Sequence, residues 1–176
     1  AVRKPKKEAQ ETQEAVNAGK DGFKVAAHDW NFYSDKVRAA KYGFDANQLK
    51  PYFELDRVLN DGAFFAANKL WGITFKQRKD LPVYDPDVRV YDVFEENGAH
   101  LAIFVLDPYA RPNKRGGAWM NALVNQSTLL GNKPVITNNL NLAKPAPGEP
   151  TLLTWDEVRT TFHEFGHGTH GWFSKV

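Results

Sequence analysis

The sequence predicts an α+β fold that is mainly helical, with a small sheet containing antiparallel strands between amphipathic helices and a last helix. Three observations support this. Apolar residues recur every three or four positions in residues 28–42 and from 51 to about 71, as on one face of a helix. β-Branched residues and turn signals dominate residues 73–143. A helix-start signal and renewed helical spacing mark residues 154–176.

The first third of the chain is expected to be helical. Residues 1–18 are polar and helix-prone, and Gly19 and Gly22 end that stretch. The second predicted helix, residues 28–42, has core positions Trp30, Tyr33, Val37 and Ala40. The third begins after Pro51, with Gly62 as a candidate interruption and with core positions Phe53, Val58, Phe65 and Leu70.

The middle of the chain is expected to form the sheet. Residues 88–106 predict a hairpin around the turn Glu96-Asn97-Gly98, and residues 117–120 and 134–138 predict two further strands or extended segments. No internal repeat or linker divides the chain. We therefore expect residues 1–176 to form a single segment of a larger domain, with its parts at 1–72, 73–143 and 154–176.

Composition excludes several classes of protein. The net charge of +2 is too small to indicate a nucleic-acid partner, and the basic cluster at residues 3–7 precedes acidic residues, as on a solvated helix face. The absence of cysteine excludes disulfides and thiolate ligands. No apolar run reaches the roughly 18 residues of a membrane span, and no signal peptide is visible. A cytoplasmic location is expected, with a periplasmic one left open, because a start without Met indicates a fragment.

The last helix has a well-defined start. Thr154 and Glu157 form a predicted capping box, and Leu153 and Val158 a hydrophobic staple. At about 100° per residue, one broad side collects Trp155, Val158, Phe162, Phe165, Thr169, Trp172, Phe173 and Val176. The histidines 163, 167 and 170 lie on another side, and Glu164 is expected on the edge far from the apolar stripe. Glycines at 166, 168 and 171 indicate either close approach by another group or fraying after Gly168.

Residues 163–167 read His-Glu-Phe-Gly-His, which is an H-E-x-x-H motif. Two histidines one turn apart can hold one zinc ion, and the intervening carboxylate can act as a general base. We therefore predict His163 and His167 as metal ligands and Glu164 as the catalytic base, with a chance match as the alternative. His170 is too far along a straight helix to be the third ligand and is predicted to act in the second shell or toward the substrate.

The third zinc ligand is expected outside these residues. The extended motif of one zinc-peptidase class requires Gly and His where His170 and Phe173 stand. The remaining route is a carboxylate on a later helix. His28 and His100 are expected to be ordinary loop or surface residues. The basic loop residues Arg111, Lys114 and Arg115 either bind a substrate carboxylate or are simply solvated.

The motif helix resembles that of the thimet oligopeptidase family of zinc metallopeptidases, which includes oligopeptidase A. Residues 163–170 read His-Glu-Phe-Gly-His-Gly-Thr-His and follow Leu-Leu-Thr-Trp-Asp-Glu-Val at 152–158. Further segments match the family in order, at residues 30–33, 36–42, 50–55, 81–84, 87–89, 116–120 and 144–148. The family's run after the second histidine is usually Ala-Leu-His, whereas Gly168-Thr169-His170 stands here.

The resemblance implies a zincin-like segment ending just after the motif helix, one Zn²⁺ per complete site, and hydrolysis of short peptides. Within the family the likeness is to peptidyl-dipeptidases, which release C-terminal dipeptides. An endopeptidase like oligopeptidase A, and a non-catalytic fragment that binds metal weakly or not at all, are the alternatives. The isolated fragment is expected to be inactive. A peptide is expected to lie along an edge strand, either Gly117, Ala118 and Trp119 or residues 134–141. Expected partners are peptides and the rest of the parent polypeptide, without nucleic acid or membrane.

Overall fold

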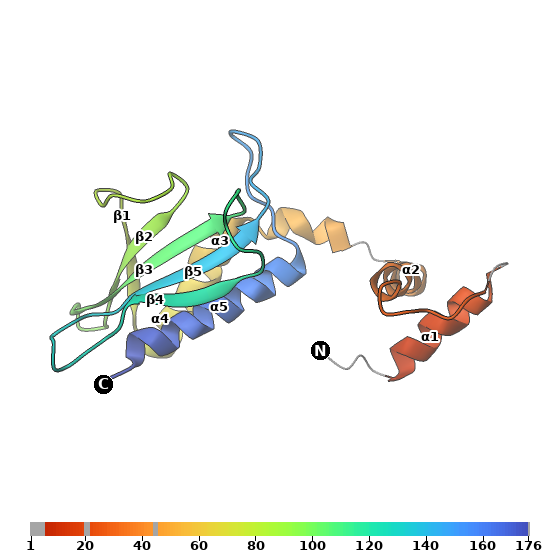
Figure 1. Ribbon diagram of the computed structural model, residues 1–176, viewed down its shortest axis with the longest axis horizontal. Coiled ribbons are helices and arrows are strands. Elements are labelled where there is room, and N and C mark those ends of the chain that lie inside the picture. Colours follow the sequence, from red (N-terminus) through yellow and green to blue (C-terminus); the bar gives the residue numbers. More distant parts are fainter. Residues whose placement is uncertain (1–5, 20–21, 44–45, 176) are drawn as a thin grey trace. The chain divides into compact units, whose positions relative to one another are not determined.

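The computed structural model describes residues 6–19, 22–43 and 46–175, and the chain divides into two compact units, residues 1–48 and 49–176 (Figure 1). A 3-10 helix, η1 (Ala46–Tyr52), contains the boundary. The prediction of an α+β fold is confirmed, since helices and a five-stranded mixed sheet are both present. That all residues belong to a single domain stays a prediction.

The first unit pairs two helices, α1 (Lys6–Asn17) and α2 (Trp30–Tyr42), where the sequence predicts them. Lys41 Nζ donates to the Glu11 carboxylate at 2.9 Å, and the Gln13 side chain holds the connecting segment by accepting from Val25 N at 2.9 Å. The predicted core stripe of α2 is only half-buried, and Ala40 is exposed, because two helices alone cannot enclose a core. The basic cluster at residues 3–7 lies outside the residues whose side chains are described.

The second unit begins with a continuous helical run made of α3 (Leu55–Arg57), the π-helix η2 (Val58–Phe64) and α4 (Phe65–Trp71). The run follows Pro51 and ends at Trp71, as predicted, but it begins only after the N-cap Glu54, whose carboxylate accepts from two backbone amides, because Pro51 itself lies in η1. The predicted burial of Phe65 and Leu70 is wrong, since they are 54% and 69% exposed. The wider π-turn rotates the later residues around the helix axis. The residues buried in their place are Leu59, Ala63, Phe64 and Ala67.

The sheet has strand order β1-β2-β3-β5-β4. Its strands are β1 (Thr74–Arg78), β2 (Arg89–Phe94), β3 (His100–Tyr109), β4 (Trp119–Val124) and β5 (Val135–Leu142). The predicted hairpin is β2–β3, and the two predicted extended segments are β4 and β5. β3 and β5 are parallel, and every other neighbouring pair is antiparallel. β4 is therefore an edge strand, which leaves one row of its backbone groups without a strand partner among the described residues.

The main core lies between the sheet and the two helical segments that cover one face of it (Figure 1). An aromatic cluster fills this space: Phe64 stacks on Phe75 with ring centroids 4.0 Å apart, and both contact Phe165. Phe104 and Trp172 complete the cluster. A smaller cluster of Val88, Val90 and Val105 lies apart from it. Residues 102, 104 and 106 of β3 belong to the main core, so the alternating residues 103, 105 and 107 face the opposite side of the sheet.

The last helix, α5 (Trp155–Phe173), starts as predicted. Thr154 Oγ1 accepts from Glu157 N at 3.2 Å and the Glu157 carboxylate accepts from Thr154 N at 2.7 Å, which completes the capping box. The alternative of fraying after Gly168 is wrong, because the helix continues to Phe173. Its last residues pack on the sheet, where Trp172 contacts Phe75 and Phe104.

The buried stripe of α5 is rotated from the predicted one. Its buried residues are Val158, Thr161, Glu164, Phe165, Gly168, Thr169 and Trp172. Trp155, Phe162 and Phe173, predicted to be core residues, are 54%, 39% and 39% exposed. They contact the preceding segments, where Trp155 meets Phe53 and Phe173 meets Trp71. The small residues Thr161 and Gly168 face inward because they allow the helix to approach closely.

No helix within residues 6–19, 22–43 and 46–175 is long and apolar enough to cross a membrane.

Candidate metal centre

The two motif histidines lie together on the exposed side of α5. The Nε2 atoms of His163 and His167 are 3.1 Å apart. Two nitrogens bound to one tetrahedral zinc at the usual bond length are about 3.3 Å apart. Both rings are exposed, with their planes nearly perpendicular at a centroid distance of 4.7 Å. The residue types and the spacing therefore fit two ligands of one zinc ion.

Glu164 lies between the histidines and the body of the unit. It is only 7% exposed, so the prediction that it lies far from the buried side of the helix is wrong. Its position one residue after His163 places it at the margin of the buried stripe. Within the described part of the chain, its carboxylate takes part in no hydrogen bond or ion pair. The carboxylate is thus close to the histidine pair and available to accept a proton.

A pocket of about 390 Å³ joins the motif to the edge of the sheet. Ala118, just before β4, lines it together with His163 and Glu164. The other lining residues are Asp156, Arg159 and Thr160. The predicted substrate segment at residues 117–119 therefore reaches the motif, whereas the alternative strand β5 is enclosed between β3 and β4. Sequence reasoning missed Arg159 and Thr160, although their spacing of four and three residues before His163 places them on its side of the helix.

His170 lies in a different pocket. It shares a space of about 430 Å³ with Trp71, Gly166 and Phe173. No group of three potential metal ligands exists among the residues that the structure describes. His170 therefore does not complete the pair as a third ligand, as expected from the rise of the helix. Its predicted second-shell or substrate-facing role stays a prediction.

The glycines of α5 differ in their surroundings. A Cβ atom on Gly171 would lie 2.8 Å from Cδ1 of Ile136 on β5, whereas one on Gly166 would meet nothing within 4 Å. Close approach therefore explains Gly171 and not Gly166. Gly62 of η2 also lies close to α5, since a Cβ atom there would lie 3.0 Å from the Phe162 ring. Helix α5 is thus held closely on two sides, next to the motif residues.

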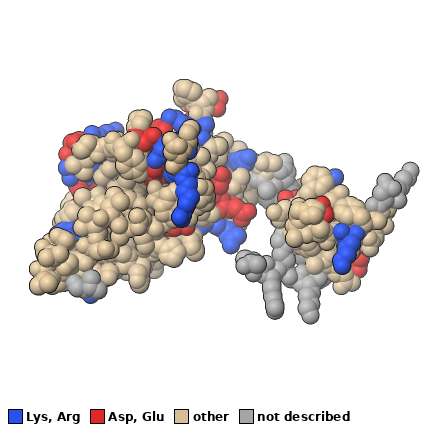
Figure 2. Space-filling model, viewed as in Figure 1, with Lys and Arg blue, Asp and Glu red and all other residues tan. Residues whose placement is uncertain are grey.

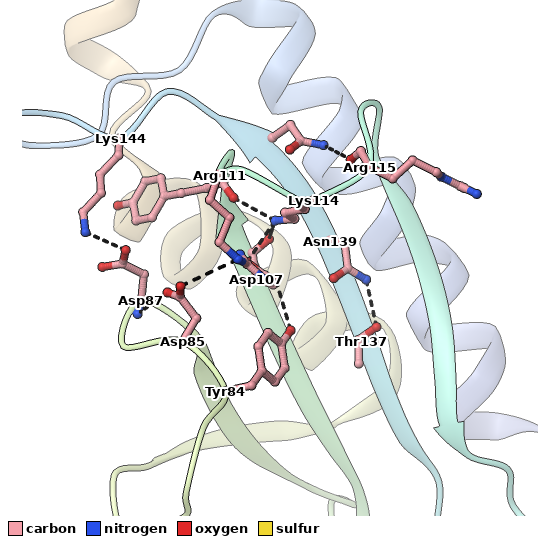
Figure 3. A network of polar contacts seen from close by, with 12 residues as sticks. Tyr84, Asp85, Asp87, Asp107, Arg111, Lys114, Arg115, Thr137, Asn139 and Lys144 are labelled. Atoms are coloured by element: carbon pink, nitrogen blue, oxygen red, sulfur yellow. Dashed lines mark hydrogen bonds and ion pairs between the residues drawn. The ribbon is translucent and has the colours of Figure 1, made fainter.

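The basic loop between β3 and β4 is not free, as Figure 3 shows. Arg111 and Lys114 both donate to the buried carboxylate of Asp107, at 2.7 and 2.9 Å. Neither substrate binding nor simple solvation describes these two residues. Arg115 is exposed, and its guanidinium lies 5.2 Å from the Trp119 ring centroid. Asp107 was missed because it directly follows the predicted hairpin of residues 88–106. The available signal was an acidic residue shortly before three basic ones.

The two remaining histidines lie outside the motif. His100 Nε2 is 3.1 Å from Oδ1 of Asp92, which also pairs with Arg78. His28 is exposed beside Asp29 in the first unit.

Figure 2 shows that charged side chains of both signs cluster over the loops, while much of the surface in this view of the second unit is uncharged. Exposed apolar residues of β4 and the following turn are Leu123, Val124, Leu129 and Leu130.

Comparison with known proteins agrees with the family resemblance. Peptidase family M3 matches residues 1–176. The chain is 53% identical over 163 residues to the dipeptidyl carboxypeptidase of Escherichia coli K12, covering 93% of this chain and 24% of that protein. It is 51% identical over 167 residues to the Salmonella typhimurium dipeptidyl carboxypeptidase, covering 95% and 25%.

A more distant relative is oligopeptidase A of Escherichia coli K12, which is 42% identical over 151 residues, covering 84% of this chain and 22% of that protein. The chain thus spans about a quarter of the length of the curated relatives it matches. The match along all residues, together with the histidine pair on α5, leads to one conclusion: the chain belongs to peptidase family M3.

Proposed function

We propose that this chain is the motif-bearing segment of a zincin-like metallopeptidase that releases C-terminal dipeptides from short peptides. The observation that carries the proposal is the pairing of the His163 and His167 Nε2 atoms at 3.1 Å, beside a Glu164 carboxylate that has no partner within the described residues. The greater identity to dipeptidyl carboxypeptidases than to oligopeptidase A favours dipeptide release over internal cleavage.

The histidine side chains supply imidazole nitrogen ligands, which suit zinc. A zinc ion held there would supply Lewis acidity toward a peptide carbonyl and a water molecule. The third ligand, predicted to be a carboxylate, is not among the described residues. Until it is supplied, two ligands leave the ion incompletely held.

Glu164 has the geometry of a general base. Its carboxylate would accept a proton from the attacking water and return it to the nitrogen of the leaving amine. Burial at the margin between helix and sheet already restricts the Glu164 side chain. Peptide binding therefore does not have to pay the entropy of fixing it. The helix holds its position through the packing of Phe165 and Trp172 in the core.

The free edge of β4 is the proposed place for the peptide. An extended peptide can add to an exposed strand edge through main-chain hydrogen bonds, which recognise any sequence. Ala118 lines the same pocket as His163 and Glu164, so a peptide along residues 117–119 would pass the motif. Gly117 is exposed, although its carbonyl already accepts from Asn141.

The direct test is Glu164→Gln in the full-length peptidase. We expect hydrolysis to fall by roughly 100-fold or more, with zinc content unchanged, because glutamine keeps the shape but cannot accept the proton. Zinc is measured by atomic emission and hydrolysis with a short reporter peptide. Glu149→Gln, in an exposed loop, is the matched control and should keep full activity. Retained activity in Glu164→Gln would refute the assignment.

The choice between dipeptide release and internal cleavage is tested with two peptides that differ in one group. A peptide with a free C-terminal carboxylate should lose a dipeptide, while its C-terminal amide should be a poor substrate. Equal cleavage of both at an internal bond would favour the oligopeptidase A-like alternative.

The 176-residue chain alone is expected to show no hydrolysis. Measurable activity of this chain would contradict the need for a third ligand. A cytoplasmic location stays a prediction.

A further inference from the structure

The buried carboxylate of Asp107 organises the loop that leads to β4. The Asp107 side chain is 2% exposed and lies near the end of β3, on the side of the sheet away from α5. Arg111 donates to both of its oxygens, at 2.7 and 2.8 Å, and Tyr84 Oη donates at 3.0 Å. Lys114 adds a fourth donor at 2.9 Å. We call Asp107, Arg111, Lys114 and Tyr84 the Asp107 cluster (Figure 3).

Lys114 is the residue of the cluster that fixes the loop backbone. Its ammonium group uses all three protons: one for Asp107 Oδ1, one for Asp107 O at 3.0 Å and one for Tyr109 O at 2.9 Å. Its side chain is only 4% exposed. Burial lowers the pKa of Lys114, against the opposing effect of Asp107. A buried lysine with every donor used cannot also serve a ligand, so its contribution is to the shape of the loop.

The far end of the loop is held separately, by β5. The Asn141 amide donates to Arg115 O at 2.7 Å and to Gly117 O at 2.6 Å. Gly117 has a φ of +85°, and Asn113 has a φ of +70°. Only glycine enters this region freely, and asparagine tolerates it better than most residues. The loop thus has one defined path, held at its start by the Asp107 cluster and at its end by Asn141.

We propose that Asp107 and Asn141 are positioning residues for peptide binding, acting by holding the residue-117 peptide group at the place where the substrate meets the edge of β4. This inference rests on the proposed function, since it requires a peptide to lie along residues 117–119. The carbonyl of Gly117 accepts from Asn141, so the carbonyl cannot turn toward the substrate and the chain direction of Ala118 is set. Ala118 in turn lines the pocket of His163 and Glu164.

The position of residues 117–119 is expected to affect peptide binding more than the chemical step. Hydrogen bonds to a peptide main chain form in the ground state and persist in the transition state, so their loss raises KM and leaves kcat nearly unchanged. Loss of Glu164 has the opposite signature, because the proton transfer occurs only during reaction. The two contributions can therefore be separated by kinetics.

The test is Asn141→Asp in the full-length peptidase. The change preserves side-chain size but replaces the two donors by an acceptor that faces two carbonyl groups. We expect KM for a short peptide to rise roughly tenfold with kcat within about twofold of the wild type. Zinc content should not change. Amide hydrogen exchange at residues 117–119 should become faster, which measures release of the segment directly.

Asp107→Asn is the second variant, and Asp92→Asn is its matched control. Asp92 is also buried and also pairs with an arginine, but it lies on β2, separated from β4 by β3 and β5. Both changes should lower the melting temperature, and only Asp107→Asn should raise KM. An equal rise of KM in Asp92→Asn would show a general effect of instability and overturn the proposal.

An unchanged KM in Asn141→Asp would also overturn it, whatever Asp107→Asn does. That result would leave the proposed function intact, provided that Glu164→Gln is inactive. Retained activity in Glu164→Gln would instead remove the proposed function on which the inference rests. The two failures are therefore distinguishable within one set of variants.

Discussion

The exposed side of α5 and the Asp107 cluster both concentrate polar side chains, yet they use them in opposite ways. His163 and His167 are exposed, and Glu164 has no partner within the described residues. In the Asp107 cluster, one carboxylate accepts four hydrogen bonds and the lysine has none of its protons free. The same residue types are therefore accessible on α5 and enclosed by their own partners in the Asp107 cluster, so only those on α5 are placed to meet a ligand.

We expect opposite outcomes for alanine substitutions in the two regions. His163→Ala and His167→Ala should abolish zinc binding and peptide hydrolysis in the full-length peptidase. The free energy of unfolding of the metal-free protein should change by less than about 0.5 kcal/mol, because exposed side chains contribute little to stability. Calorimetric zinc titration and urea unfolding measure the two quantities. Strong destabilisation by either change would mean that the pair also has a structural role.

Asp107→Ala should show the reverse pattern in stability. Removal of one partner leaves the buried Lys114 unpaired, and such a loss costs about 3–5 kcal/mol. Urea unfolding measures the cost. Replacing Asp107 and Lys114 together should cost less than the sum of the single changes, since no unpaired charge then remains buried. Additive effects in this double-mutant cycle would show that the pair does not act as a unit.

Two glycines of α5 allow a smaller test of its two sides. Gly171→Ala should destabilise by about 1–3 kcal/mol, because the new methyl group would meet the Ile136 side chain at 2.8 Å. Gly166→Ala meets nothing within 4 Å and should stabilise the helix by up to about 1 kcal/mol. Thermal unfolding distinguishes them. Equal effects would contradict the assignment of Gly171 to the sheet-facing side.

The smallest expected effect is on how the free energy of unfolding depends on pH in the acid range. Burial alone would raise the pKa of Asp107, but hydrogen bonds from Arg111 and Lys114 outweigh it and lower the pKa in the folded state. As pH falls, the Asp107 carboxylate is therefore protonated at a higher pH in the unfolded chain than in the folded protein. The contribution of Asp107 is complete above about pH 4 and is lost as pH falls through the folded-state value.

Asp107→Asn removes this titration. Its free energy of unfolding should depend less on pH below about 4 than that of the wild type. Unfolding in urea at several pH values between neutral and acid measures the slope. An unchanged slope would mean that other carboxylates, such as Asp92, whose pKa is also lowered despite its burial, dominate acid sensitivity.

Local signals in the sequence were sufficient for most of the elements. The capping box at Thr154, the β2–β3 hairpin and both helices of the first unit lie where their patterns predict, because each depends on residues close in the chain. The motif spacing also determines that His163 and His167 share one side of a helix. These features require no information about distant parts of the chain.

Burial and strand order depended on contacts between distant parts of the chain. The π-turn of η2 changed which residues of the 55–71 run are buried, and the rotation of α5 buried Glu164, because packing between surfaces selects among helix phases that local pattern leaves open. Parallel pairing of β3 with β5 made β4 the edge strand beside the motif. The order of residues was enough to specify the chemical groups and their local spacing. Which groups were satisfied in the interior, and which remained free to act, depended on contacts between residues far apart in the chain.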